Sequence, residues 1–217
     1  MAAHRRWEIA LYRIKEIFYS LQGEGIYSGR AAVFIRFSGC NLWSGLEHDR
    51  LSADCAFCDT DFLGMDGELG GKYDAEELAQ TALSLWSSDE RPFVICTGGE
   101  PLLQIDSALL DALHAMGGLV AVETNGTLPA LPGIDWITVS PKAGTELRQT
   151  SGNELKLVYP QNGIDPSLYE HYPFEHFFLQ PVDSPEQPNS LEESVEYCLT
   201  HPKWKLSVQM HKAVNIK

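Results

Sequence analysis

The chain has 217 residues, of which 44% are hydrophobic and 21% are charged, and its formal net charge is −14. This length fits one domain over residues 1–217 that can bury a substantial core. The acidity argues against nucleic acid or an anionic membrane as the main partner. No apolar run approaches the roughly 20 residues of a membrane helix, and the segment from Met1 to Arg6 lacks the apolar core of a signal peptide. We therefore expect a cytoplasmic protein.

Strands and helices are predicted to alternate along the chain. The β-branched and aromatic run at 32–37 indicates a strand, and the Gly-, Asp- and Ser-rich residues 40–72 indicate a long loop. Asp74 and Glu77 have the spacing of a capping box, which starts a helix that runs through Leu85. This alternation predicts an α/β fold with a parallel sheet and helices outside it. Further strands are expected at 92–96, 119–122, 136–139, 154–159, 176–179 and 206–209, and further helices at 106–116 and 191–199.

Three of the five cysteines, Cys40, Cys55 and Cys58, lie within 19 residues, with 14 residues in the first gap and two in the second. The odd number of cysteines argues against a disulfide framework. Three thiolates would leave one iron of a [4Fe–4S] cluster open, whereas His48 would complete a closed zinc site, and inert thiols are a third possibility. Spacing alone leaves these three interpretations open. The other two cysteines are expected to be packed thiols and not ligands: Cys96 in an apolar strand and Cys198 in a helix.

Polar and glycine-rich clusters follow directly after most of the predicted strands. Because the carboxyl ends of parallel strands meet at one edge of a sheet, we expect these clusters to line one pocket. Gly and Pro are ordinary turn residues, but a turn needs no charged side chain. The carboxylate of Glu100 is a candidate to bind an ammonium group there. The clusters are 98–100, 123–125, 140–142, 180–181, and Gln209 with His211.

The residues around the cysteines favour the iron–sulfur cluster. The run Cys55-Ala56-Phe57-Cys58, followed by Gly-Gly-Glu-Pro at 98–101, resembles the radical S-adenosylmethionine (SAM) superfamily. That superfamily usually has the spacing Cys-x3-Cys-x2-Cys, so the first gap departs from it here. Motifs along nearly the whole chain from Ile14 on are similar to the 7-carboxy-7-deazaguanine synthase (QueE) family, some members of which carry such an expanded loop. These motifs lie at 22–25, 34–42, 55–60, 98–101, 123–126, 139–142, 153–156 and 206–212.

The resemblance implies a fold, a reaction and partners. The implied fold is an abridged, open radical SAM partial (β/α) barrel with mostly parallel strands. The implied enzyme is a carbon–nitrogen lyase that converts 6-carboxy-5,6,7,8-tetrahydropterin to 7-carboxy-7-deazaguanine with loss of ammonia, on the route to queuosine. The implied cofactors are a [4Fe–4S] cluster, SAM and Mg²⁺. The implied partners are the pterin, an external one-electron donor such as a flavodoxin, and a second copy in a homodimer.

The resemblance also assigns roles to residues, position by position. It places iron ligation on Cys40, Cys55 and Cys58, and the Mg²⁺ ligand at Thr60. The residues expected to border SAM are Phe57, Cys58, Asp59, Gly99, Glu123, Asn125, Ser140, Pro141, Lys142, Gln180, Pro181, Val182 and Asp183. The residues expected to border the pterin are Leu21, Gln22, Gly23, Arg36 and Thr97, with the carboxylate of Lys217 reaching the same pocket.

Several of these side chains suit their implied ligands chemically. The planar guanidinium of Arg36 can bind a carboxylate through two hydrogen bonds. The alternative is that Arg36 forms a surface ion pair. Gln22 offers a donor and an acceptor to a pterin edge, or is a turn residue before Gly23. Lys142 belongs to the pocket or is a solvated lysine. Glu123 holds the ribose of SAM or caps the next turn.

Two positions need a further comment. Thr60 supplies the hard oxygen that Mg²⁺ prefers, although it also suits a turn after the cysteine pair. The closing run of the family usually reads Gln-Thr-His-Lys, and Met210 takes the place of the threonine here. If this run is a strand, Gln209 and His211 still share one face.

Two other classes of protein share part of this pattern. An activating enzyme that makes a protein glycyl radical has three cysteines and a Gly-Gly-Glu-Pro run. A non-catalytic zinc or electron-transfer module would need only the cysteines.

Overall fold

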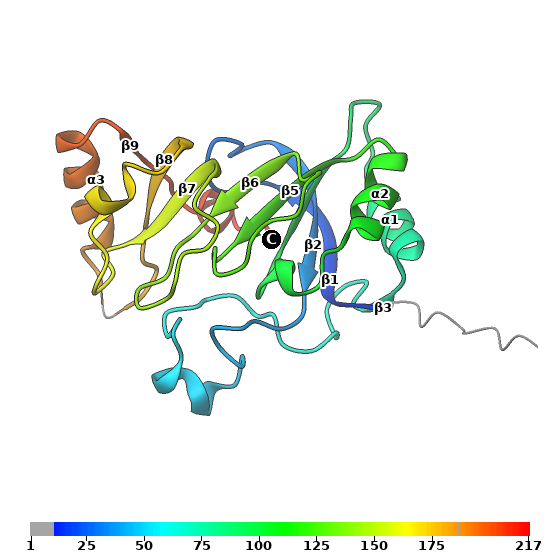
Figure 1. The fold of residues 1–217 in the computed structure, drawn as a ribbon, viewed down its shortest axis with the longest axis horizontal. Helices are drawn as coiled ribbons and strands as arrows, with labels where there is room; N and C mark the ends of the chain where they lie inside the picture. The colour runs from blue at the N-terminus through cyan, green and yellow to red at the C-terminus, as the bar shows by residue number, and fades with distance from the viewer. Residues whose placement is uncertain (1–10, 186) are drawn as a thin grey trace, which may run out of the picture.

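The computed structural model describes residues 11–185 and 187–217, so the segment from Met1 to Arg6 lies outside the described residues. In the described part, nine strands form one open sheet in the order β3-β1-β2-β4-β5-β6-β7-β8-β9 (Figure 1). The strands are β1 (Tyr12–Leu21), β2 (Ala31–Phe37), β3 (Gly71–Tyr73), β4 (Phe93–Gly98), β5 (Leu119–Thr124), β6 (Trp136–Val139), β7 (Gly152–Tyr159), β8 (Phe174–Pro181) and β9 (Trp204–Leu206). The helices are α1 (Ala75–Leu83), α2 (Ser107–Ala115), α3 (Ser190–Thr200) and α4 (Met210–Ala213), with short 3-10 helices at Glu47–Ser52, Pro101–Leu103 and Pro166–Tyr169.

The sheet is parallel from β2 to β9, as the alternation of strands and helices predicts. Only β1 is antiparallel to its neighbours β2 and β3. Strand β1 is absent from the predicted elements. Its register shifts between Ile14 and Glu16, so the apolar residues do not alternate strictly with polar ones along it. No helix among the described residues is long and apolar enough to span a membrane.

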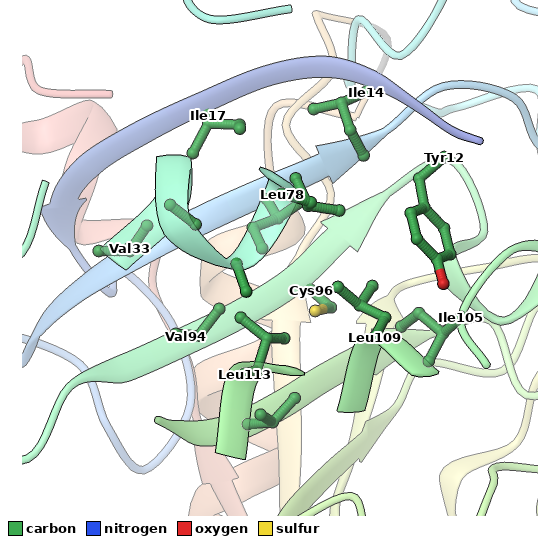
Figure 2. Close-up of a cluster of buried hydrophobic side chains, with 14 of the residues drawn as sticks. Tyr12, Ile14, Ile17, Val33, Leu78, Val94, Cys96, Ile105, Leu109 and Leu113 are labelled. Carbon is green, nitrogen blue, oxygen red and sulfur yellow. The ribbon is translucent and has the colours of Figure 1, made fainter. Parts of the chain in front are cut away.

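One face of the sheet packs against α1 and α2. Val33 of β2 and Val94 of β4 meet Leu109 and Leu113 of α2 in this core (Figure 2). Cys96 lies in the same core with none of its surface exposed, and burial raises its pKa to about 12. The prediction that Cys96 is a packed thiol is confirmed. Cys198 on α3 is half-buried and packs against a second core beneath β7, β8 and β9.

The opposite face of the same strands is apolar near the start of each strand and polar near its end. On β2 Phe34 precedes Arg36, and on β4 Ile95 precedes Thr97. Since residues i and i+2 of a strand share a face, each pair points to the side opposite α1 and α2. This face therefore has an apolar floor and a polar rim at the carboxyl ends of the strands, where α/β folds place their sites.

The local predictions are confirmed at the first helix and fail at the last strand. Asp74 accepts a hydrogen bond from the Glu77 N–H at 2.9 Å, and Glu77 reaches back to the Asp74 N–H, which completes the capping box. The strand expected at 206–209 is wrong. Strand β9 ends at Leu206, and the Met210 N–H donates to the carbonyl of Gly23 at 2.9 Å, which turns the chain into α4.

The long loop predicted at 40–72 is present and ends where β3 begins. We call residues 40–70 the cysteine loop. Its only regular element is the 3-10 helix Glu47–Ser52, which has no buried residue. In Figure 1 this loop projects beyond the ends of the central strands, apart from the helices. It is therefore placed to cover the polar rim from one side.

Candidate active site

One cavity of about 380 Å³ lies at the carboxyl ends of the parallel strands. It is bounded by the cysteine loop on one side and by residues 207–217, the C-terminal segment, on another. The prediction that the strand-end residues share one pocket is confirmed, and the volume suits a small organic ligand. The expected site residues that line this cavity are Leu21, Gln22, Gly23, Arg36, Cys40, Cys55, Phe57, Cys58, Asp59, Thr60, Thr97, Gly99, Glu123, Asn125, Ser140, Lys142, Gln180, Pro181, Val182, Asp183 and Lys217.

Pro141 differs from its neighbours. It is buried and does not line the cavity, whereas Ser140 and Lys142 on either side do. The Lys142 ammonium donates to the Ser140 carbonyl at 2.6 Å and to its hydroxyl at 2.7 Å. Burial lowers the pKa of Lys142. The alternative of a solvated lysine is therefore wrong, whereas the assignment of Pro141 to the border of SAM stays a prediction.

The three clustered cysteines reach the cavity from the cysteine loop. Cys55 is buried, and Cys40 and Cys58 are half-buried. A hydrogen bond from the thiol of Cys55 lowers the pKa of Cys58 to about 6, against the effect of burial. Burial raises the pKa of Cys40, while the Leu42 N–H donates to its sulfur at 3.4 Å and opposes that shift. N–H donors to sulfur are among the features that tune iron–sulfur clusters.

The described residues form no closed site for a single metal ion. Within residues 11–185 and 187–217, no group of three His, Cys, Asp or Glu side chains converges on a point suited to one ion. The His48 side chain is 75% exposed and lies 3.2 Å from Asp49, so it does not complete a zinc site with the cysteines.

Gly98 and Gly99 allow the end of β4 to approach the start of the cysteine loop. Gly98 has a φ of +127°, a conformation that favours glycine. A Cβ at Gly99 would collide with the carbonyl of Gly39 and with the side chain of Cys40. The Glu100 N–H also donates to the Gly39 carbonyl at 3.0 Å. The two glycines thus hold the loop's first cysteine against the sheet.

Glu100 has a structural role. It is fully buried, and its carboxylate accepts hydrogen bonds from the Thr124 hydroxyl at 2.9 Å and from the Asn125 N–H at 2.8 Å. The Leu102 N–H donates to the same carboxylate at 3.0 Å. Burial raises the pKa of Glu100, and these donors oppose the shift. The expectation that Glu100 binds an ammonium group is wrong, because its oxygens join β4 to β5.

Another part of the cavity wall is a mostly buried polar network. Lys156 on β7 forms an ion pair with Glu24 and lies 3.8 Å from Glu123. Gln22 donates to Glu123 at 2.8 Å, and Gln180 donates to Glu24 at 3.0 Å. Burial alone would raise the pKa of Glu24, but the charge of Lys156 and its hydrogen bond hold that pKa below its usual value.

No role was predicted for Glu24 or Lys156. The available signal is Lys156 itself, a charged residue at the centre of an apolar strand, because a buried charge requires a partner. Glu123 caps no turn. It accepts from Gln22 and lies 3.5 Å from the hydroxyl of Thr97, two residues expected to border the pterin, and the expectation that Glu123 itself borders SAM stays a prediction.

Arg36 lines the cavity and also forms an ion pair. Its Nε donates to Glu16 at 2.9 Å, and both side chains are mostly buried, with exposed fractions of 21% and 17%. In the described part of the chain its two Nη atoms have no partner, so they can still receive a carboxylate. The Lys217 ammonium lies 3.3 Å from the same Glu16 and 3.1 Å from Glu68.

The C-terminal segment contacts the polar network at Glu24, the cysteine loop at Asp59, and Asp183 just past β8. Gln209 donates to Glu24 at 3.1 Å. Lys212 forms ion pairs with Asp59 at 2.7 Å and with Asp183 at 2.5 Å. His211 also lines the cavity, even though the strand used to predict its direction is absent.

No protein-family model matches the chain. The chain is 57% identical over 208 residues to the 7-carboxy-7-deazaguanine synthase of Bradyrhizobium diazoefficiens, a match that covers 95% of this chain and 99% of the relative. It is 56% identical over 209 residues to the synthase of Bordetella pertussis, covering 94% and 99%. The chain belongs to the 7-carboxy-7-deazaguanine synthase family. The crystal structure of QueE from Escherichia coli superposes with a TM-score of 0.69 and 27% identity, covering 93% of this chain and 95% of that chain.

The chain is therefore a radical SAM enzyme of the queuosine pathway. The open, mostly parallel sheet confirms the expected abridged barrel. Membership of this family implies a [4Fe–4S] cluster and SAM in general, and an organic small molecule as substrate. It decides against a glycyl-radical activating enzyme and against a non-catalytic zinc or electron-transfer module.

Proposed function

We propose that the enzyme converts 6-carboxy-5,6,7,8-tetrahydropterin to 7-carboxy-7-deazaguanine with loss of ammonia, and that Cys40, Cys55 and Cys58 hold its [4Fe–4S] cluster. The observation that carries this proposal is the two-sided cavity. Three cysteine sulfurs line one side, and buried carboxylates, amides and a lysine line the other. The first side suits a cluster with one open iron, and the second suits a flat ring rich in donors and acceptors.

The walls between the cysteines and the strand ends suit SAM. When bound, the cluster and SAM supply the radical that begins the reaction on the pterin. Phe57 offers an aromatic face beside Cys58, and Gly99 leaves backbone groups accessible at the end of β4. Ser140 and Lys142 add polar contacts from the end of β6. The other residues proposed to border SAM are Cys58, Asp59, Glu123, Asn125, Pro141, Gln180, Pro181, Val182 and Asp183.

The polar network suits the pterin. Arg36 is fixed at Nε by Glu16, so its Nη atoms are oriented before a substrate carboxylate arrives. Gln22 and Glu123 are hydrogen-bonded to one another and can offer one donor and one acceptor to the ring edge. Because Lys156 neutralises Glu24 and Glu123 in part, the site can hold a polar ring without excess negative charge. Leu21, Gly23, Thr97 and Lys217 complete the proposed pterin side.

We assign the Mg²⁺ ligand to Thr60. Its hydroxyl lies two residues past Cys58 and at the cavity wall, and Mg²⁺ usually binds a few protein oxygens while it keeps several waters. The cation would help to orient the substrate carboxylate.

The remaining parts of the proposal concern the cellular setting. We propose a cytoplasmic homodimer that receives one electron at a time from a carrier such as a flavodoxin. An iron–sulfur enzyme with thiols and no described disulfide suits a reducing compartment.

The test is anaerobic incubation of the reconstituted enzyme with SAM, a reductant and the carboxy-tetrahydropterin, followed by mass spectrometry. We expect 7-carboxy-7-deazaguanine and released ammonia, and neither product with Cys55→Ala. A reconstituted enzyme that holds four irons, cleaves SAM and leaves the pterin unchanged would refute the substrate assignment. An enzyme that binds no iron would refute the cysteine assignment.

A further inference from the structure

The cysteine loop buries Trp43 and Phe62, but between Trp43 and Cys55 it buries no side chain that could anchor it. The 3-10 helix Glu47–Ser52 buries no side chain, and Leu51 within it is fully exposed. The 14 residues between Cys40 and Cys55 nevertheless have to return the chain so that the cysteines face one cavity. Polar contacts must therefore determine the path of the chain between Cys40 and Cys55.

The side chain of Arg50 makes several of these contacts. One guanidinium nitrogen, Nη1, donates to the carbonyl of Ala56 at 2.8 Å and to the carbonyl of Cys58 at 2.9 Å. Nε donates to the carboxylate of Glu47 at 2.8 Å. The guanidinium also stacks over Trp43, 4.1 Å from the ring centre, and Trp43 is buried against Phe62. Arg50 thus ties the start of the loop to the turn that carries Cys58.

This position also brings a permanent positive charge to the cysteines. The nitrogen that bonds the Cys58 carbonyl belongs to a side chain that is only 29% exposed. An arginine stays charged throughout the accessible pH range. Reduction adds one negative charge to an iron–sulfur cluster, and nearby charge is one of the features that sets its potential. A cation beside Cys58 therefore favours the reduced cluster over the oxidised one.

We propose that Arg50 is a positioning residue for the cluster: its two carbonyl hydrogen bonds fix the turn that carries Cys58, and its charge raises the cluster's reduction potential. The inference rests on the proposed function, because it requires the cluster on Cys40, Cys55 and Cys58. It adds a tuning residue inside the expanded loop, where none of the expected ligands lies.

Four variants of the reconstituted enzyme separate charge from geometry. Arg50→Gln removes the charge and the stacked plane. Arg50→Lys keeps the charge but loses the planar guanidinium with its fixed set of donors. Glu47→Gln removes the carboxylate beside Arg50 and leaves the carbonyl bonds. Arg148→Gln is the matched control, because Arg148 forms a similar ion pair with Glu146, at 3.0 Å, outside the cavity.

The measurements are iron content, the reduction midpoint from an anaerobic redox titration followed by electron paramagnetic resonance, and hydrogen exchange over residues 46–58. We expect a more negative midpoint in Arg50→Gln, a midpoint near wild type in Arg50→Lys, and a less negative one in Glu47→Gln. Exchange over the loop should be faster in both Arg50 variants than in Arg148→Gln, because the carbonyl bonds are lost or weakened.

Two results would overturn the inference. One is an Arg50→Gln enzyme with full iron content whose midpoint equals that of Arg148→Gln. The other is an Arg50→Lys enzyme whose loop amides exchange as slowly as those of the wild type. If Arg50→Gln binds no iron, this exchange measurement alone tests the inference. A wild-type protein without a four-iron cluster would instead refute the proposed function, so the two failures are distinguishable.

Discussion

The two sides of the cavity are built in different ways. The polar network stands on regular strands: Lys156 lies on β7 and Gln180 on β8, and both side chains are buried. The cysteine loop has one short 3-10 helix without a buried residue. The side chain of Arg50 fixes the path of this loop by hydrogen bonds to backbone carbonyls.

This difference indicates where each side obtains its order. Strand-borne groups are positioned by the sheet before any ligand binds, which favours precise recognition of a polar ring. The loop gains order when its three cysteines bind one cluster, since metal binding and folding are coupled. The pterin side should therefore resist loss of the cluster, and the cysteine side should not.

The largest effect is expected at the iron ligands. Cys40→Ala, Cys55→Ala and Cys58→Ala should each abolish the visible absorbance of the cluster and all SAM cleavage, because each ligand is required to hold iron. Iron analysis and SAM cleavage assays after anaerobic reconstitution measure this. Cys96→Ala and Cys198→Ala are the controls and should keep the cluster. Retained activity in Cys55→Ala would contradict the ligand assignment.

The next effect tests whether the polar network is fixed independently of the cluster. Lys156→Met leaves Glu24 and Glu123 buried without their cation, and breaking a buried ion pair costs about 3–5 kcal/mol. Urea unfolding measures the loss, and iron content should stay at the wild-type level.

Lys212→Met is the matched control for Lys156→Met. Lys212 also contacts two carboxylates, but its side chain is 39% exposed, and exposed pairs contribute about 0–1 kcal/mol. Equal losses of unfolding free energy in Lys156→Met and Lys212→Met would show that burial does not strengthen the ion pairs of the polar network.

Substrate binding offers a third test of the pterin side. Arg36→Lys keeps a charge near Glu16 but cannot pair with Glu16 and with a substrate carboxylate in the same fork. We expect pterin affinity to fall by about 1.5–3 kcal/mol, the range for a hydrogen bond to a charged group. SAM affinity should change little. An equal loss of SAM binding would place Arg36 in a structural role or beside SAM.

A smaller effect is expected where the two sides meet. Thr60→Val removes one oxygen ligand of the proposed Mg²⁺ site. Half-maximal product formation should require about tenfold more Mg²⁺, which corresponds to roughly 1.4 kcal/mol. The measurement is the rate in metal-free buffer with added Mg²⁺ for both proteins. A variant that responds as wild type does, or a wild type without Mg²⁺ dependence, would refute the assignment.

The smallest effect concerns acid stability. The pKa of Glu24 is lowered in the folded state, so its contribution is present above the unfolded pKa of about 4.3 and is lost as pH falls through the folded pKa. Glu24→Gln should therefore flatten the decline in unfolding free energy below about pH 4.3. Urea unfolding of cluster-free protein across this range measures the slope. Identical slopes in both proteins would show that Glu24 titrates normally.

Much of the fold follows from local patterns along the sequence. The apolar strands β4, β5 and β6 and the capping box at Asp74 are each read from adjacent residues, because hydrophobic periodicity and capping are local effects. Strand β1 and the end of β9 were missed. The first has an irregular register, and the second is terminated by a contact with Gly23, about 190 residues away in sequence.

The amino-acid sequence alone shows which chemical groups are present: three clustered cysteines, polar residues after most of the strands, and motifs that identify the family. Which of these groups face the cavity follows from the folded structure. The carboxylate of Glu100 accepts hydrogen bonds that join the end of β4 to the end of β5, and Pro141 is buried without lining the cavity. Glu24 and Lys156, 132 residues apart, form the ion pair that organises the pterin side. The physical reason is that burial and pairing depend on neighbours in space, and no local pattern records which distant residue will supply the partner charge.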